Sequence, residues 1–173
     1  MAGVLMGRRG VWPMLALAAL GFAMMPPSAQ AAMYVNARFG YSIVYPDNLL
    51  VAERESDNSD GGAFHARRGP AKMSVWGSYR DEDTEKTSDA IARLYETDCG
   101  AGKVTYRVVK PRLVAFSCVN AAGRIIYQKT LIDGDVLRSM RFEYPYADRA
   151  TWDPVIKQVA GSLSAVPAFG RKP

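Results

Sequence analysis

The sequence has 173 residues and a net charge of +5, from 22 basic and 17 acidic residues. Without residues 1–31, which contain Arg8 and Arg9 and no acidic residue, the net charge is +3 over 142 residues. That length predicts one domain with a hydrophobic core, and so small a charge does not indicate a nucleic-acid-binding protein, whose surface carries a concentrated basic face.

Residues 1–31 have the composition of a secretory signal peptide. Arg8 and Arg9 form a positive n-region, an apolar run from Val11 to Met25 follows, and Ala29-Gln30-Ala31 fits the small-x-small cleavage site. The apolar run is short for a membrane span and contains Pro13. We therefore predict an exported protein, periplasmic or secreted, with no transmembrane anchor after cleavage. An uncleaved anchor is the alternative, and the export route is open between the general secretory and twin-arginine systems.

Strand-like runs over 39–45 and 49–52 begin the domain, and the turn residues Pro46-Asp47-Asn48 separate them. The polar segment 53–62 that follows resembles a calcium loop only in composition. Its oxygen ligands do not fall at alternate positions with Gly sixth and Glu twelfth. A solvated hairpin loop is the better interpretation.

Two further strands are predicted over 62–66 and 73–79, joined by a basic turn with Arg67 and Arg68. The only histidine, His65, lies in the first of these strands. A catalytic base needs a nucleophile and an orienting group, and the sequence places neither beside it. We expect this side chain to be packed or solvent-facing, and we predict no metal site, because its ligand partners are missing.

The charged segment 80–86 is expected to be a solvated loop. A helix then starts near Thr87 or Ser88, either of which can cap it, and ends at Cys99–Gly102. Side chains one turn apart give this helix an apolar stripe for packing on a sheet, at Ile91, Leu94 and Tyr95.

Four consecutive strands are predicted next, over 104–109, 113–119, 124–132 and 136–144. Their connections are short and rich in Gly, Pro, Asn and Asp, which forces antiparallel pairing.

Turn lengths set the register of these strands. With turns over 110–112, 120–123 and 133–135, Val109 lies opposite Leu113. Side chains predicted to share one face are Val104, Tyr106, Val108, Val114, Phe116, Cys118, Ile125 and Tyr127. The opposite face becomes apolar only toward the last strand. Both faces therefore need cover, which predicts helices on both sides of the sheet.

A second helix is predicted after Asp153-Pro154, a cap followed by proline at the first helical position. Residues 164–173 are expected to form a flexible tail. Taken together, the elements predict an α+β fold: a single domain over 32–163, with a central antiparallel sheet of about six to eight strands and helices packed on both faces as an α/β/α sandwich.

Cys99 and Cys118 are the only cysteines of a chain predicted to be exported, where thiols are oxidised by default. The hairpin register places Cys118 opposite Val104, and Gly100-Ala101-Gly102 lets Cys99 fold back toward it. A redox-active pair would favour a close Cys-x-x-Cys spacing. We predict a structural disulfide that stabilises the fold by roughly 3 kcal/mol.

Four segments within residues 34–163 carry a family resemblance: Phe39–Pro46, Val104–Val109, Gly123–Tyr127 and Phe142–Pro145. In this order they resemble an exported bacterial branch of the Mog1/PsbP-like superfamily. The resemblance implies a central antiparallel sheet between helices. Better-known members are binding proteins, namely a photosystem II extrinsic subunit and a Ran-binding nuclear transport factor. No motif of their contact sites matches this chain, so neither role transfers.

The first functional hypothesis is a non-catalytic exported domain that binds or stabilises a partner protein in the cell envelope. Its candidate contacts are the basic residues Arg67, Arg68, Arg107, Lys110 and Arg112. The alternative for each of them is a purely solubilising role on a turn or strand face.

The second hypothesis is a small-molecule carrier with a pocket between sheet and helix, around Tyr106, Phe116, Tyr127 or Trp152. Aromatic residues at such positions more often belong to the core. The third is a hydrolase with dispersed residues, although the sequence has no G-x-S-x-G elbow, paired metal ligands or phosphate loop. We therefore predict a protein without catalytic activity or cofactor, and leave its oligomeric state open.

Overall fold

The computed structural model describes residues 30–166. Residues 1–29 of the predicted signal peptide and residues 167–173 of the predicted tail lie outside the described residues. The last two residues of the predicted signal peptide are described. Gln30 accepts a backbone hydrogen bond from Asp47, and Ala31 begins the first strand.

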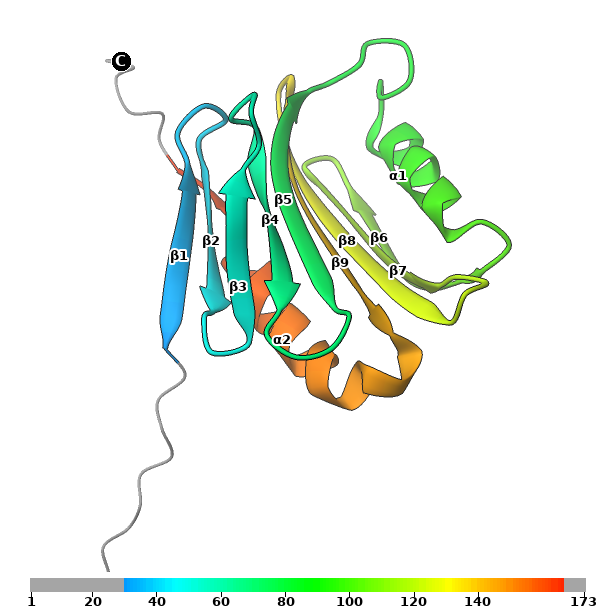
Figure 1. Ribbon diagram of the computed structural model, residues 1–173. Coiled ribbons are helices and arrows are strands. Elements are labelled where there is room, and N and C mark those ends of the chain that lie inside the picture. The colour runs from blue at the N-terminus through cyan, green and yellow to red at the C-terminus, as the bar shows by residue number, and fades with distance from the viewer. Residues whose placement is uncertain (1–29, 167–173) are drawn as a thin grey trace, which may run out of the picture.

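Two antiparallel sheets form the β-structure of the described residues (Figure 1). The larger sheet has seven strands in the order β3-β4-β5-β9-β8-β7-β6. In chain order these are β3 (Leu50–Glu55), β4 (Gly61–Ala66), β5 (Lys72–Tyr79), β6 (Lys103–Lys110), β7 (Leu113–Val119), β8 (Arg124–Asp133) and β9 (Val136–Pro145). In the smaller sheet, β2 (Tyr41–Pro46) pairs with β1 (Ala31–Asn36) and β10 (Ser164–Ala165).

Two α-helices accompany the sheets, each next to a short 3-10 turn. The first, α1 (Ser88–Glu96), begins at the predicted cap, where the Thr87 hydroxyl accepts a hydrogen bond from the Ala90 amide, and continues into η1 (Thr97–Cys99). The second, α2 (Arg149–Ser162), follows η2 (Tyr146–Asp148). It therefore starts before the predicted Asp153-Pro154 cap. Pro154 lies inside the helix and has no amide hydrogen to donate to the carbonyl of Ala150, an exposed residue.

The large sheet buries apolar side chains on both faces, which confirms the predicted α+β architecture. On one face, Ile91 of α1 packs with Val114 and Leu137. On the other, α2 and the small sheet cover a larger core in which the Phe142 and Trp152 rings are 5.4 Å apart. Figure 1 shows α1 beside β6–β8 and α2 at the opposite side of the sheet.

The predicted turns were each one residue too long. Lys110 pairs with Leu113 and Asp133 with Val136, so both of these turns contain two residues. The β7–β8 turn contains three, since Asn120 bonds Arg124. Gly123 and Gly134 have φ of 68° and 58°, a backbone conformation that permits such tight turns.

This shift corrects the predicted faces. Tyr106 lies opposite Ser117 on the α2 side, whereas Phe116 and Cys118 point to the α1 side. Tyr127 also pairs with Ser117 and so belongs with Tyr106, not with Phe116. A one-residue change in turn length moves a strand's whole set of side chains to the other face.

A β-bulge at Thr105 restores the predicted pairing of Val104 with Cys118.

The end of the domain also differs from prediction. Ser164 and Ala165, expected in the flexible tail, form β10, and the Val166 amide donates to the Gly40 carbonyl.

Gly77 on β5 provides the space for the Phe39 ring. A Cβ at Gly77 would lie 2.2 Å from Phe39 Cγ, and Phe39 is buried. We expect Gly77→Ala to lower the free energy of unfolding by about 2 kcal/mol, because the ring has to shift within a packed core. Urea denaturation measures this. Gly62→Ala is the matched control, since its Cβ would meet nothing closer than 3.5 Å. Equal free energies of unfolding for the two variants would contradict close packing of the Phe39 ring on Gly77.

Candidate binding groove between α2 and the outer strands

A groove of about 520 Å³ opens where α2 diverges from the outer part of the large sheet. The helix packs mainly on β2 and β9, so the α2-side face of β6, β7 and β8 is only partly covered. The sheet contributes Tyr106, Ala115, Ser117, Tyr127, Lys129 and Tyr144 to the lining, and α2 contributes Asp153, Ile156, Lys157, Ala160 and Gly161. We call this site the α2 groove.

Small residues of β7 form the floor of the α2 groove. Ala115 and Ser117 are small, and Ser117 lies between Tyr106 of β6 and Tyr127 of β8. Burial raises the pKa of Tyr127 to about 12, so its hydroxyl is neutral at physiological pH. Tyr106 is 49% exposed. The site therefore presents two aromatic surfaces above a floor of small residues.

Lys129 brings a positive charge into this mostly apolar site. It lies on β8, partly buried, and its Nζ donates a hydrogen bond to the Ala160 carbonyl. That carbonyl belongs to the last turn of α2, where backbone acceptors lack helical partners and a cation is favoured. Burial lowers the pKa of Lys129. This lysine thus anchors the end of α2 to the sheet and also lines the groove.

The groove holds one carboxylate and a second lysine, both on the exposed side of α2. Asp153 accepts a 2.6 Å hydrogen bond from the Tyr144 hydroxyl, which ties α2 to β9. Burial, and then this carboxylate, raise the pKa of Tyr144. Lys157 lies one helical turn after Asp153. The charged residues that line the groove are therefore two lysines and one aspartate.

Of the four aromatic residues predicted around a pocket, Tyr106 and Tyr127 line the α2 groove. Phe116 is fully buried on the α1 side, in the same cluster as the two cysteines. Trp152 is buried in the main core against Phe142. Lys129 and Gly161 were not predicted as site residues, and their only signal in the sequence is a lysine inside a strand and a glycine inside a helix.

The five basic residues predicted as partner contacts do not form one surface. The β4–β5 turn with Arg67 and Arg68 lies at the end of the sheet where Lys72 pairs with Glu143. Lys110 and Arg112 lie at the opposite end, beside the β8–β9 turn, where Arg112 pairs with Asp133.

Arg107 is occupied within the domain. It points to α1 and forms ion pairs with Asp89 and Glu96, at 3.2 and 2.7 Å. These two hydrogen bonds raise the pKa of Arg107. Its contacts fasten α1 to the edge strand β6.

His65 has a single acidic neighbour. Its Nδ1 is 3.1 Å from Glu53 Oε1 across the β3–β4 pair, and both side chains are about half exposed. Within residues 30–166, no group of three His, Cys, Asp or Glu side chains could hold a metal ion.

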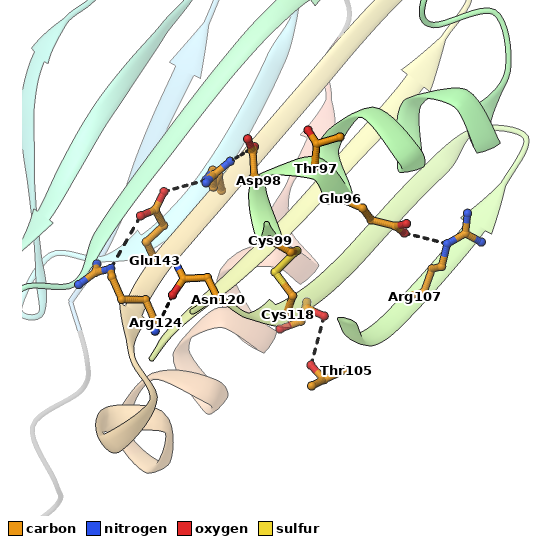
Figure 2. Close-up of a disulfide and its surroundings, with 12 residues drawn as sticks. Glu96, Thr97, Asp98, Cys99, Thr105, Arg107, Cys118, Asn120, Arg124 and Glu143 are labelled. Atoms are coloured by element: carbon orange, nitrogen blue, oxygen red, sulfur yellow. Dashed lines mark hydrogen bonds and ion pairs between the residues drawn. A yellow bond between two sulfur atoms is a disulfide. The ribbon is translucent and has the colours of Figure 1, made fainter. Parts of the chain in front are cut away.

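The predicted disulfide is present and joins the end of η1 to β7 (Figure 2). Cys99 and Cys118 are both buried, and their Cα atoms are 6.1 Å apart. Ion pairs flank this link: Glu96 with Arg107 on β6, and Asp98 with Arg141 on β9. Arg141 also bonds Glu143 at 2.8 Å. The region after α1 is thus attached to three strands.

Comparisons with known proteins show the fold. No family model and no curated protein matches the sequence. The solution structure of cyanobacterial PsbP (CyanoP) from Synechocystis sp. PCC 6803 is similar over 86% of this chain and 98% of that chain, with a TM-score of 0.59 and 13% identity. This chain has the PsbP-like fold. A crystal structure from Bacteroides thetaiotaomicron VPI-5482 has a TM-score of 0.51 and 11% identity, and covers 82% of this chain and 50% of that one.

The predicted superfamily resemblance is therefore confirmed at the level of the PsbP-like fold. Identities of 13% and 11% carry no function with them. Among the described helices of this PsbP-like domain, none is long and apolar enough to cross a membrane. The buried disulfide is consistent with a location outside the cytoplasm.

Proposed function

We propose that this chain is an exported, non-catalytic domain that binds a small molecule in the α2 groove. Export is supported by the composition of residues 1–31 and by the disulfide, because such bonds persist in oxidising compartments. Ligand sites in proteins are usually concave, mostly apolar and supplied with a few polar groups. The α2 groove has these properties.

The observation that carries the proposal is the α2 groove itself, a concave and mostly apolar surface with a half-exposed tyrosine in its lining. Tyr106 keeps 49% of its surface accessible, although α2 runs along the same face of the sheet. A larger residue at Gly161 could have closed part of the gap, since a Cβ there would meet no atom within 4 Å. A groove of about 520 Å³ lies within the usual range for ligand sites.

The chemistry of the lining supports binding over catalysis. In the described residues the lining contains no histidine or cysteine, and its one carboxylate accepts the Tyr144 hydroxyl. A nucleophile with an adjacent base is the arrangement that hydrolysis by covalent catalysis requires. His65, the one histidine, lies on β4, outside this lining.

Binding of a partner protein in the cell envelope is the second candidate. Met33 and Val35 of β1 are 64% and 45% exposed and point to the same side of an edge strand. Adjacent exposed apolar side chains favour a protein contact. The five basic residues first considered for this role give it less support, because four of them are divided between two ends of the sheet and Arg107 is paired with α1.

Gly161 offers the sharpest test of the groove. We expect Gly161→Leu to weaken binding of the neutral dye Nile red by about tenfold or more, equivalent to 1.4 kcal/mol, because the new side chain occupies the groove. Gly161→Ala is the control and should leave the affinity close to that of the wild type. Both substitutions replace a helical glycine, so neither is expected to destabilise α2.

Fluorescence titration of the protein without residues 1–31 measures these affinities, and a thermal melt confirms that each variant is folded. Equal affinity of both variants and the wild type would place the dye elsewhere and contradict the proposed site.

A further inference from the structure

The charges of the α2 groove indicate which ligands it selects. Lys129 is its innermost charged residue, since Asp153 and Lys157 both lie on the exposed face of α2. In the part of the chain that the structure describes, neither groove lysine forms an ion pair with an acidic side chain. A positive charge held away from water without a negative partner is unfavourable, and an anion placed beside it removes that penalty.

The ammonium of Lys129 retains hydrogen-bonding capacity. A lysine ammonium has three donors. One of them bonds the Ala160 carbonyl, and no other acceptor among residues 30–166 lies within hydrogen-bond distance of Nζ. Two donors are therefore free for a ligand, and the bond to Ala160 fixes the position of the charge.

The only carboxylate in the groove is positioned so that it does not neutralise Lys129. Asp153 bonds Tyr144, and it forms no ion pair of 4 Å or less with any lysine in the described residues. It lies in the same helix as Lys157, four residues before it, where opposite charges attract weakly. The excess charge inside the groove is thus positive.

The walls select for a flat apolar body. Tyr106 and Tyr127 lie on either side of Ser117, and Ile156 lines the same groove from α2. Both flanking residues are aromatic, and aromatic pairs gain energy by offset or edge-to-face stacking. An aromatic ligand can stack on these tyrosines, whereas an aliphatic chain gains only apolar contact.

We propose that the α2 groove binds a small organic anion with a planar aromatic body, its anionic group at Lys129 and its ring between Tyr106 and Tyr127. This inference rests on the proposed function and adds the ligand class. The ammonium supplies charge-assisted hydrogen bonds to the anion, which are about twice as strong as neutral ones. The aromatic walls supply apolar contact.

Calorimetric titration with 2-naphthoate and the isosteric neutral 2-naphthamide tests the ligand class. We expect the wild type to bind the carboxylate about tenfold more tightly than the amide, equivalent to 1.4 kcal/mol. Lys129→Met keeps the apolar stem of the side chain and removes the charge, so this preference should disappear. Lys157→Met is the matched control at the exposed rim and should keep most of the preference.

The outcomes separate the two proposals. Equal affinity of the wild type for both probes, abolished by Gly161→Leu, would overturn the ligand class and leave the groove as the binding site. Loss of the preference in Lys157→Met but not in Lys129→Met would overturn the role of Lys129. No binding of either probe would overturn both proposals. The wild-type comparison needs no variant, so instability of Lys129→Met cannot mask the result.

Discussion

Reduction of the Cys99–Cys118 disulfide is expected to lower the free energy of unfolding by about 3 kcal/mol. The bond closes a loop with a sequence separation of 19, and it thereby restricts the unfolded chain. It also holds η1, which directly follows α1, against β7. Because both sulfur atoms are buried, a reductant acts mainly on the unfolded or partly opened protein.

Urea denaturation with and without reductant measures this difference. A double variant, Cys99→Ala with Cys118→Ala, should have nearly the same free energy of unfolding as the reduced wild type. A small further loss is expected because alanine fills less volume than cysteine. The flanking ion pairs of Arg107 and Arg141 remain in both forms, so the folded structure should persist. An unchanged denaturation midpoint on reduction would contradict the structural role of the disulfide.

The second large effect is expected at alkaline pH. Burial is the main cause of a raised pKa at five tyrosines: Tyr34, Tyr41, Tyr95, Tyr127 and Tyr144. In the unfolded chain a tyrosine ionises near pH 10. Above that pH the unfolded state releases protons that the folded state still holds. Stability therefore falls by up to about 1.4 kcal/mol per pH unit for each such tyrosine.

Ionisation of Lys129 changes the free energy of unfolding in the opposite direction, and over a lower pH range. Its pKa is lowered in the folded protein, so its contribution to stability increases as the pH rises toward the ordinary lysine value of about 10.4. That gain is complete before the tyrosines of the folded state ionise. We therefore expect cooperative unfolding between about pH 10 and 12, with no compensation from Lys129.

Circular dichroism and phenolate absorbance, recorded together from pH 9 upward, test this expectation. The phenolate absorbance of the buried tyrosines should appear in the same transition in which the circular dichroism is lost. Tyr127→Phe removes one ionising group whose hydroxyl bonds no other group in the described residues, so the variant should unfold at a higher pH. Phenolate formation that is complete near pH 10 while the circular dichroism is unchanged would contradict the burial of these tyrosines.

Local signals in the sequence predicted most of the fold. Thr87 marks the start of α1, and the short polar connections mark the antiparallel strands, because these positions depend on backbone chemistry within a few residues. The disulfide was also predicted, from two cysteines in a chain expected to be exported. β1 was missed because its first residue overlaps the predicted cleavage site.

The faces of the strands depended on more than local signals. A turn such as Asn120–Gly123 can close with three or four residues, and Gly123 at positive φ selects the shorter form. Tyr106 lies on the groove side, and not on the predicted side, because the β6–β7 turn is one residue shorter than predicted. The groove itself depends on where α2 crosses the sheet, and the hydrophobic periodicity of the sequence does not predict that position. Arg107 and Arg112 resemble contact residues in sequence but pair with acids far away in the chain.

Two-dimensional NMR of the isotope-labelled protein, titrated with 2-naphthamide, tests the binding site most directly. This probe is neutral, so the result does not depend on the charge selectivity of Lys129. We expect the largest chemical-shift changes at Tyr106, Ser117, Tyr127 and Gly161, which line the α2 groove. Changes confined to Met33 and Val35 on β1, or no changes at saturating probe, would contradict a ligand site between α2 and the outer strands.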